Sequence, residues 1–350
     1  MSDPHDVALY IFVNDENELR SGWRVLLFFI CLFLVAALLT GLGKAVATLF
    51  PSTAFIFEMP PEPDSPTREY LTRLGVSNVT NLVAAVIASA VCAKLLERRR
   101  LGSVGFRLHR GWQRDFALGS LMGAASLAIA VGIAASVGAL GFDVQTREWP
   151  PLLRGFMITS LFFLIAGAVE ELIFRGFAFQ ALIHNLGGPA AIAITSLVFG
   201  LAHVQNPDAS VFSTINTTLA GIWLAVAYLI TRSLWLATAL HWSWNFAMVF
   251  IFGLPVSGLT TLGGLAWLRG IAGEPSWVSG GSYGPEAGLA ATLGLILSTL
   301  AIWKSGLFTA SEDMLLAIRH GKRQPTCVSI TPTRQDPAEP ESVLRGVDQD

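Results

Sequence analysis

Long apolar runs, separated by short polar or glycine-rich segments, constrain the fold of this chain more than any other feature of its sequence. The run from Val25 to about Leu42 is long enough to cross the roughly 30 Å hydrocarbon core of a membrane as a helix. Similar runs recur almost to the end of the chain. Because 53% of the 350 residues are hydrophobic and only 14% are charged, we expect an all-α, polytopic integral membrane protein.

The runs predict a helical bundle of about eight transmembrane helices. A proline-rich and acidic stretch at residues 50–77 favours neither a helix nor a strand, so we interpret it as a loop. Residues 253–286 are rich in glycine and fit either a loop or a partly re-entrant segment. Gly119 and Gly123 in the third run suit close helix packing. We expect the spans at about residues 25–42, 82–96, 116–140, 156–183, 189–204, 214–230, 234–252 and 287–303.

Basic residues between the second and third runs indicate the orientation of the chain. Residues 94–114 contain seven Lys or Arg residues and one acidic residue, a bias that is typical of cytoplasmic loops. With an even number of spans, both termini then lie in the cytoplasm. We therefore predict an integral protein of a bacterial plasma membrane, surrounded by the lipid bilayer. The net charge of −2 argues against a nucleic-acid partner.

Three charged residues interrupt the fourth apolar run, where ionisable groups are costly to bury. Adjacent residues on a helix point about 100° apart, so Glu170 and Glu171 face different surroundings. Glu171 and Arg175 stand four residues apart, in the order that favours an ion pair. We therefore interpret Glu171 and Arg175 as an internal ion pair, and we expect Glu170 to face a cavity.

Few other groups capable of chemistry lie within the apolar runs. His203 lies in the fifth run, whereas His241 and Asn245 lie one helical turn apart in the seventh and share a face. A carboxylate and an imidazole can hold and activate a water molecule, and we assign this role to Glu170 and His203. A second imidazole and an amide, those of His241 and Asn245, can stabilise the oxyanion that forms when water attacks a carbonyl. Together these residues predict peptide-bond hydrolysis without a covalent nucleophile, since the predicted spans contain neither a Gly-x-Ser-x-Gly elbow nor a Cys/His pair.

Three motifs together resemble the CAAX-protease and bacteriocin-processing (CPBP) family. They are Glu-Glu-x-x-x-Arg at 170–175, Phe-x-x-x-His at 199–203 and His-x-x-x-Asn at 241–245, in this order and on separate predicted helices. The family comprises intramembrane glutamic endopeptidases, including type II CAAX prenyl endopeptidases and abortive-infection-like membrane proteases. The resemblance covers about residues 115–255. It implies Glu170 as the general base, His203 as its partner on the water, His241 and Asn245 as the oxyanion site, and Glu171 and Arg175 as supporting residues.

The resemblance divides the chain into four predicted segments. Residues 1–114 hold the N-terminal tail, two spans and the basic loop, and residues 115–255 hold the protease-like core with the three motifs. Residues 256–304 hold the glycine-rich loop and the last span, and residues 305–350 form a polar cytoplasmic tail that we expect to be disordered. The family implies a membrane-associated protein or peptide as substrate, for CAAX processing or peptide maturation, and no cofactor.

Two other kinds of function use the same residues differently. Two histidines and one glutamate form a known catalytic zinc set, so a zinc-dependent membrane protease is an alternative, although no His-Glu-x-x-His helix is present. A transporter or a non-enzymatic immunity protein would use the buried polar groups without cleaving a peptide. Glu170 and His203 can share a water only if they lie at the same depth in the membrane. Straight helices place them at depths that agree only loosely. Gly167 and Gly200 are candidate bend points that would bring them together.

Overall fold

The computed structural model describes residues 11–14, 18–57, 68–145 and 148–319 of the chain. Within these residues, six helical segments are long and apolar enough to cross a membrane. They confirm the prediction of a polytopic helical membrane protein. The segments are Ser21–Leu49 (α2), Arg68–Glu97 (α3), Trp112–Ser136 (α4), Trp149–Leu201 (α5 and α6), Val211–Thr231 (α7) and Leu234–Ile251 (α8, Leu234–Phe246, with a π-helical end).

The number of long segments is smaller than predicted because two predicted spans share one of them. α5 (Trp149–Glu171) continues through a π-helical turn at Leu172–Gly176 into α6 (Phe177–Leu201). Gly187, with φ 79° and ψ 167°, breaks the helical geometry inside α6, and the fourth and fifth predicted spans meet there. The last predicted span corresponds to α10 (Leu289–Lys304), an apolar helix of 16 residues.

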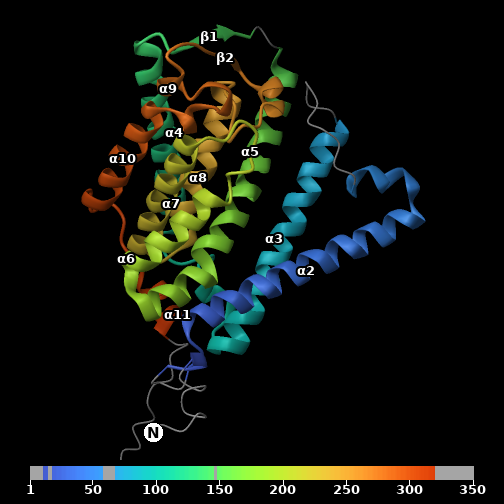
Figure 1. Ribbon diagram of the computed structural model, residues 1–350, viewed down its shortest axis with the longest axis vertical. Helices are drawn as coiled ribbons and strands as arrows, with labels where there is room; N and C mark the ends of the chain where they lie inside the picture. The colour runs from blue at the N-terminus through green and yellow to red at the C-terminus, as the bar shows by residue number, and fades with distance from the viewer. Residues whose placement is uncertain (1–10, 15–17, 58–67, 146–147, 320–350) are drawn as a thin grey trace, which may run out of the picture.

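Helices α4 to α8 and α10 form one bundle, and α2 and α3 stand beside it (Figure 1). α2 and α3 approach the bundle at the end that carries α11 (Glu312–Arg319) and lean away from it towards the other end. One core packs α4, α5, α7, α8 and α10 together, with Trp223 and Leu240 fully buried. A second core joins α2 and α3 to α6, where the rings of Phe28 and Phe177 lie 5.6 Å apart.

Glycines in α4 let this helix approach α8 closely, as the small residues of the third apolar run indicate. A Cβ atom on Gly123 would lie 2.5 Å from the backbone oxygen of Leu240, and one on Gly119 would lie 2.9 Å from the Cβ atom of Ala239. The two helices therefore pack with their backbones almost in contact. This packing fixes the position of α8, the helix that carries His241.

A small sheet and a folded segment lie at the end of the bundle opposite α11 (Figure 1). β1 (Leu140–Val144) pairs with β2 (Leu268–Ala272) in an antiparallel register that places Phe142 opposite Gly270, so the helices are accompanied by a short sheet that the sequence did not predict. Residues 252–288, which we call the cap segment, contain β2, short 3-10 turns and the single helical turn α9 (Ser276–Ser279).

The proline-rich stretch predicted as a loop is partly helical. Pro51–Phe57 form a 3-10 helix, and α3 begins at Arg68, so the loop prediction is wrong for residues 68–77. The prolines end before this helix begins, and Leu71 packs against the core of the bundle, so burial favours a helical start. Residues 58–67 lie outside the described residues.

The tail beyond the last span begins with a short helix. This helix is α11, in which Met314 is fully buried. The predicted disorder of the tail concerns residues 320–350, which lie outside the described residues.

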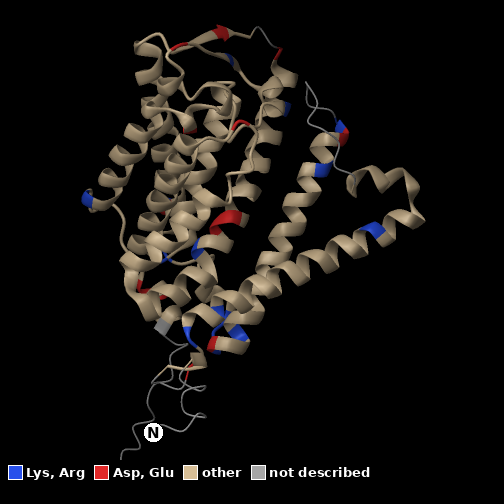
Figure 2. Cartoon of the chain, viewed as in Figure 1, with Lys and Arg blue, Asp and Glu red and all other residues tan. Residues whose placement is uncertain are grey.

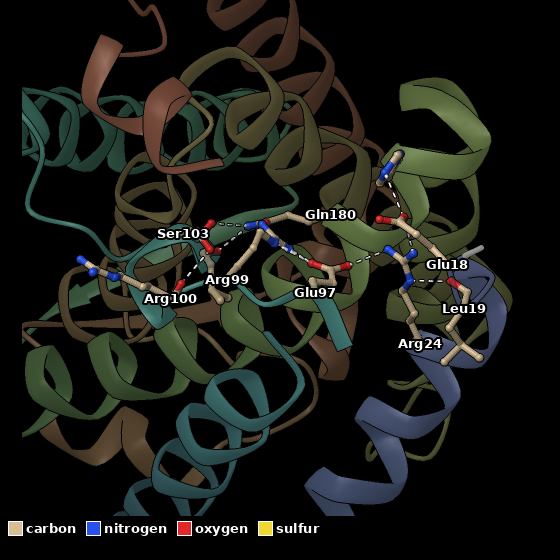
Figure 3. Close-up of polar contacts among 10 residues, drawn as sticks. Glu18, Leu19, Arg24, Glu97, Arg99, Arg100, Ser103 and Gln180 are labelled. Atoms are coloured by element: carbon tan, nitrogen blue, oxygen red, sulfur yellow. Dashed lines mark hydrogen bonds and ion pairs between the residues drawn. The ribbon is translucent and has the colours of Figure 1, made fainter. Parts of the chain in front are cut away.

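A network of charged side chains joins α2, α3 and α6 near the α11 end (Figure 3). Arg24 is only 2% exposed and contacts the carboxylates of Glu18 at 2.8 Å and Glu97 at 3.1 Å. Arg99 also pairs with Glu97, and its Nη1 donates to Gln180 Oε1 at 2.6 Å. Arg99 belongs to the basic segment at residues 94–114, so part of this segment also joins α3 to α6.

Candidate active site

Lys, Arg, Asp and Glu residues gather mainly near the two ends of the molecule (Figure 2), so a buried ion pair inside the bundle is conspicuous. Glu171 Oε1 lies 3.0 Å from Arg175 Nη1, and both side chains are 0% exposed. The structure thus contains the ion pair expected from their spacing. Arg175 Nη2 also donates to the carbonyl of Gly221 at 3.2 Å, and its guanidinium lies 4.4 Å from the centre of the Phe199 ring. These contacts tie the π-helical turn to α6 and α7.

His241 makes a contact that the sequence did not predict, because its Nδ1 lies 3.0 Å from Glu171 Oε1. With the proton on Nδ1, the ring donates to this carboxylate and directs Nε2 towards Glu170. Glu171 Oε1 therefore bridges Arg175 and His241. Gly167, one turn before Glu171, lies against the same ring, since a Cβ atom there would be 3.6 Å from His241 Cγ. The spacing of residues along α5 or α8 carries no signal for this contact between helices.

Glu170 faces both imidazole rings. Its Oε2 lies 3.9 Å from His203 Nε2 and 3.8 Å from His241 Nε2. These separations are longer than direct hydrogen bonds and leave room for a bridging water or substrate atom. The Glu170 side chain is 33% exposed, whereas that of Glu171 is fully buried. The two adjacent glutamates therefore occupy the different surroundings that their helical positions predict.

His203 lies in the turn that follows α6, where a backbone contact orients its ring. His203 Nδ1 is 2.8 Å from the carbonyl oxygen of Phe199, four residues earlier. When Nδ1 carries the proton, it donates to this carbonyl and leaves Nε2 as an acceptor on the side of Glu170. The Phe-x-x-x-His motif thus sets the direction of the imidazole through the main chain.

The irregular positions in the α5–α6 segment differ from those predicted. They are the π-helical turn at Leu172–Gly176 and Gly187, whereas Gly167 and Gly200 lie within regular helix. Gly200 instead permits close packing, because a side chain there would collide with Thr218 of α7. π-helical turns inside α-helices are frequent at functional sites, and this one directly follows Glu171.

Glu170, His203 and His241 line a cavity of about 60 Å³. A water molecule in the liquid takes up roughly 30 Å³, so the cavity has room for one or two waters. Asn245, one turn after His241 on α8, lines the same cavity, so the structure brings together the four residues predicted to act on the substrate. Apolar side chains form much of the remaining wall, namely Phe199, Ala220, Trp223, Leu224, Trp244 and Leu295.

Polar residues outside the three motifs also line the cavity, and sequence reasoning missed them. They are Asn216 and Thr217 on α7, and Ser257 and Glu286 on the cap segment. Asn216 Nδ2 donates to the carbonyl of Gly288 at 3.0 Å. Asn216 could have been found from the sequence, because an amide within an apolar run is a candidate for a polar site. Glu286 could not, because an acidic residue in a glycine-rich stretch is unremarkable.

Burial raises the pKa of the Glu286 carboxyl above its ordinary value. Hydrogen bonds from Ser257 and the proximity of His203 and His241 oppose this shift, because they favour the carboxylate, but the net direction is upward. The site therefore contains two carboxyl groups in different settings, Glu170 on α5 and Glu286 on the cap segment.

A metal site has no geometric support in the part of the chain that the structure describes. Among these residues, no group of three or more His, Cys, Asp or Glu side chains is placed so that it could hold a metal ion. The zinc-dependent alternative stays a prediction that a chelator experiment addresses directly.

Residues 152–247 match the model of a family described as type II CAAX prenyl endopeptidase Rce1-like. The matched range contains all three motifs and excludes α2 to α4, the cap segment and α10. The match confirms the family resemblance drawn from the motifs, and the family implies a protease. Comparison with curated proteins gives no match.

Proposed function

Given its Rce1-like core, we propose that this chain is an intramembrane endopeptidase of the glutamic type, which hydrolyses a peptide bond of a membrane-associated substrate. One observation carries the proposal. The Glu170 carboxylate lies within 3.9 Å of imidazole nitrogens from two other elements, beside a cavity that has room for water. A carboxylate that served packing alone would not need two imidazoles to face it.

The first step uses a water held between Glu170 and His203. His203 Nε2 accepts one hydrogen bond from the water and orients it, while Glu170 takes up the other proton. The water oxygen bonds to the carbonyl carbon, and the carbonyl oxygen becomes the oxyanion. When this intermediate collapses, the C–N bond breaks and the proton on Glu170 moves to the leaving amine, which gives a carboxylic acid and an amine.

The oxyanion is stabilised from α8. In its imidazolium form, His241 donates from Nδ1 to Glu171 and from Nε2 to the oxyanion. The amide of Asn245 supplies a second donor from the same wall of the cavity. Arg175 balances the charge of Glu171, the acceptor for His241 Nδ1.

We propose proteins with CAAX-type tails as the first substrate class, and maturing membrane peptides as the second. The family match supports the first class. We also propose that the α11 end faces the cytoplasm with both termini. The basic residues between α3 and α4 support this orientation, and the first residues of α2 lie at the same end of the molecule as α11 (Figure 1).

The proposal is tested by reconstituting the purified chain in lipid vesicles with a farnesylated CAAX peptide and with the same peptide lacking the prenyl group. Products are identified by mass spectrometry. Glu170→Gln keeps the size of the side chain but removes the base, and we expect cleavage to fall by about 10²–10⁴-fold. Glu274→Gln is the matched control, because Glu274 is exposed on the cap segment and accepts a hydrogen bond from the backbone of Ser276.

The same assay separates the alternatives. Cleavage that persists in a chelator supports the metal-independent mechanism, whereas loss in chelator and recovery with Zn²⁺ would favour the zinc protease. A transporter or immunity protein predicts no cleaved product from either peptide. Wild-type rates in Glu170→Gln would contradict the proposed role of this residue.

A further inference from the structure

The cap segment contributes a carboxylate to the same cavity as the proposed catalytic residues, although it lies outside the family match. Glu286 and Ser257 line the cavity together with Glu170, His203 and His241. Within a site of about 60 Å³, an additional carboxyl changes both the charge and the shape that a substrate meets. Its placement is therefore relevant to the chemistry and not only to the fold.

Glu286 holds a tight turn of the cap segment. Its Oε2 accepts hydrogen bonds from Ser257 N at 2.6 Å and from Ser257 Oγ at 2.8 Å. Ser257 has a φ of 49°, which non-glycine residues rarely adopt. Val256 and Leu259 close the turn, with Leu259 N donating to Val256 O at 2.9 Å. The two charge-assisted hydrogen bonds that Glu286 accepts thus stabilise a backbone conformation that Ser257 would not favour by itself.

The turn sits directly on the segment that carries His203. Gly258 packs so closely against Pro207 that any side chain at Gly258 would collide with the Pro207 carbonyl. Gly258 N also donates to the carbonyl of Tyr283 at 2.9 Å, which joins the two ends of the cap segment. If the Ser257 turn moved, the 203–208 turn that carries His203 would lose this packing contact.

The other side of Glu286 is anchored to α7. Asn216 Nδ2 donates to the carbonyl of Gly288, two residues after Glu286, and Asn216 Oδ1 accepts a hydrogen bond from Thr292 Oγ1 at 2.7 Å. α7 thereby fixes the start of α10, which follows Glu286 directly. Glu286 thus lies between the Gly288 backbone, which Asn216 holds, and the Ser257 turn.

We propose that Glu286 is a positioning residue of the active site, which closes the cap segment over the cavity and places a second carboxylate beside the two imidazoles. This inference rests on the proposed function. The titratable groups around Glu286 are Glu170 on α5, His203 after α6, His241 on α8 and Tyr283 on the cap segment itself. The elements α7 and α10 contribute only uncharged side chains to the cavity.

The charge of Glu286 predicts a shift in the pH dependence of cleavage. The proposed oxyanion donor is His241 as an imidazolium, so activity falls at alkaline pH when this proton is lost. Glu170, Glu171 and Arg175 also face His241. Glu286 adds a further carboxylate that favours the imidazolium, so its removal in Glu286→Gln moves the alkaline limb of the pH–activity profile to lower pH. A purely structural role would lower activity without moving this limb.

The experiment compares wild type, Glu170→Gln, Glu286→Gln and the control Glu274→Gln in vesicles, with the farnesylated CAAX peptide as substrate. Values of kcat and KM are measured from pH 5 to 9, and hydrogen–deuterium exchange is measured over the cap segment. For Glu286→Gln we expect the shifted alkaline limb and about tenfold faster exchange at residues 256–259, because the hydrogen bonds from Ser257 then go to a neutral amide oxygen and lose their charge assistance. Glu274→Gln should resemble wild type in both measurements.

The outcomes distinguish this inference from the proposed function. If wild type is inactive, or if Glu170→Gln cleaves at the wild-type rate, the proposed function fails and the catalytic part of this inference fails with it. If Glu170→Gln is inactive but Glu286→Gln keeps the wild-type pH profile, Glu286 has no role in the chemistry. Unchanged exchange over residues 256–259 would show that the charge of Glu286 does not stabilise the turn.

Discussion

Glu170 and Glu171 are adjacent in the sequence and both lie near His241, but the rest of their surroundings differs. Glu171 is fully buried and shares one carboxylate oxygen between Arg175 and His241. Glu170 faces the cavity and the ring nitrogens of His203 and His241. A buried carboxylate that loses its partner is strongly destabilising, so Glu171 depends on Arg175 in a way that Glu170 does not.

Removal of the Arg175 guanidinium therefore affects both stability and activity. Arg175→Ala leaves Glu171 uncompensated in the bundle, and we expect a loss of about 3–5 kcal/mol in the free energy of unfolding. Arg175→Lys keeps the charge but lacks the planar group that contacts Gly221 and Phe199, so we expect a smaller loss. Thermal unfolding in detergent and cleavage of the CAAX peptide measure the two effects.

Arg269→Ala provides the control for this prediction, because Arg269 is exposed on β2. It should unfold and cleave as wild type does. If Arg175→Ala were as active as wild type, Arg175 would not be needed to keep Glu171 and His241 in place, and the division of roles between the two glutamates would have to be revised.

At the residue scale, local spacing predicted only what local geometry determines. The four-residue separation of Glu171 and Arg175 is enough to predict their ion pair, because both lie on one helical segment. The contact between Glu171 and His241 and the presence of Glu286 in the cavity depend on how distant helices pack. No spacing in one sequence contains that information, so these two features required the structure.

Among the helices, α4 and α8 pack closely against each other. Gly123 has no room for a side chain against Leu240, whereas no heavy atom lies within 4 Å of the Cβ position of Gly132 on the same helix. α8 carries His241 and Asn245, so the packing of α4 positions the proposed oxyanion donors. A residue far from the substrate can therefore affect catalysis through the position of a helix.

Gly123→Val tests this packing, with Gly132→Val as the matched control. Both substitutions place a β-branched residue in α4, but only the first forces α4 away from α8. We expect Gly123→Val to lower the free energy of unfolding by about 1–3 kcal/mol and to reduce cleavage, and Gly132→Val to change each much less. Equal effects of the two variants on thermal unfolding would show that the close approach of α4 to α8 is not important.

At the element scale, apolar run length predicted where helices lie, and it failed where helices join or change form. The length of an apolar run does not reveal a π-helical turn such as Leu172–Gly176. The composition of the glycine-rich residues 253–286 did not indicate the strand β2. The predicted start of α3 was too late, because the prediction gave more weight to the prolines than to the apolar residues that follow them. Tertiary contacts decide such boundaries.

For the whole molecule, composition and motif order were sufficient to predict the class of protein and the family model that part of the chain matches. A polytopic helical protein follows from apolar length, and the three motifs predict the protease-family match of residues 152–247. The assembly of the cavity does not follow from either, because it combines α5, the turn after α6, α7, α8, the cap segment and α10. Two of these contributors, the cap segment and α10, lie outside the matched family region.

The central claim is that Glu170 and His203 act on one water molecule. It is tested most directly by a double-mutant cycle in which kcat/KM for the CAAX peptide is measured for wild type, Glu170→Gln, His203→Gln and the double variant. Because both residues serve the same step, the double variant should be no slower than the slower single variant, as groups that act as a unit are not additive. Losses that multiply in the double variant would show that the two residues act independently, and would contradict the shared water.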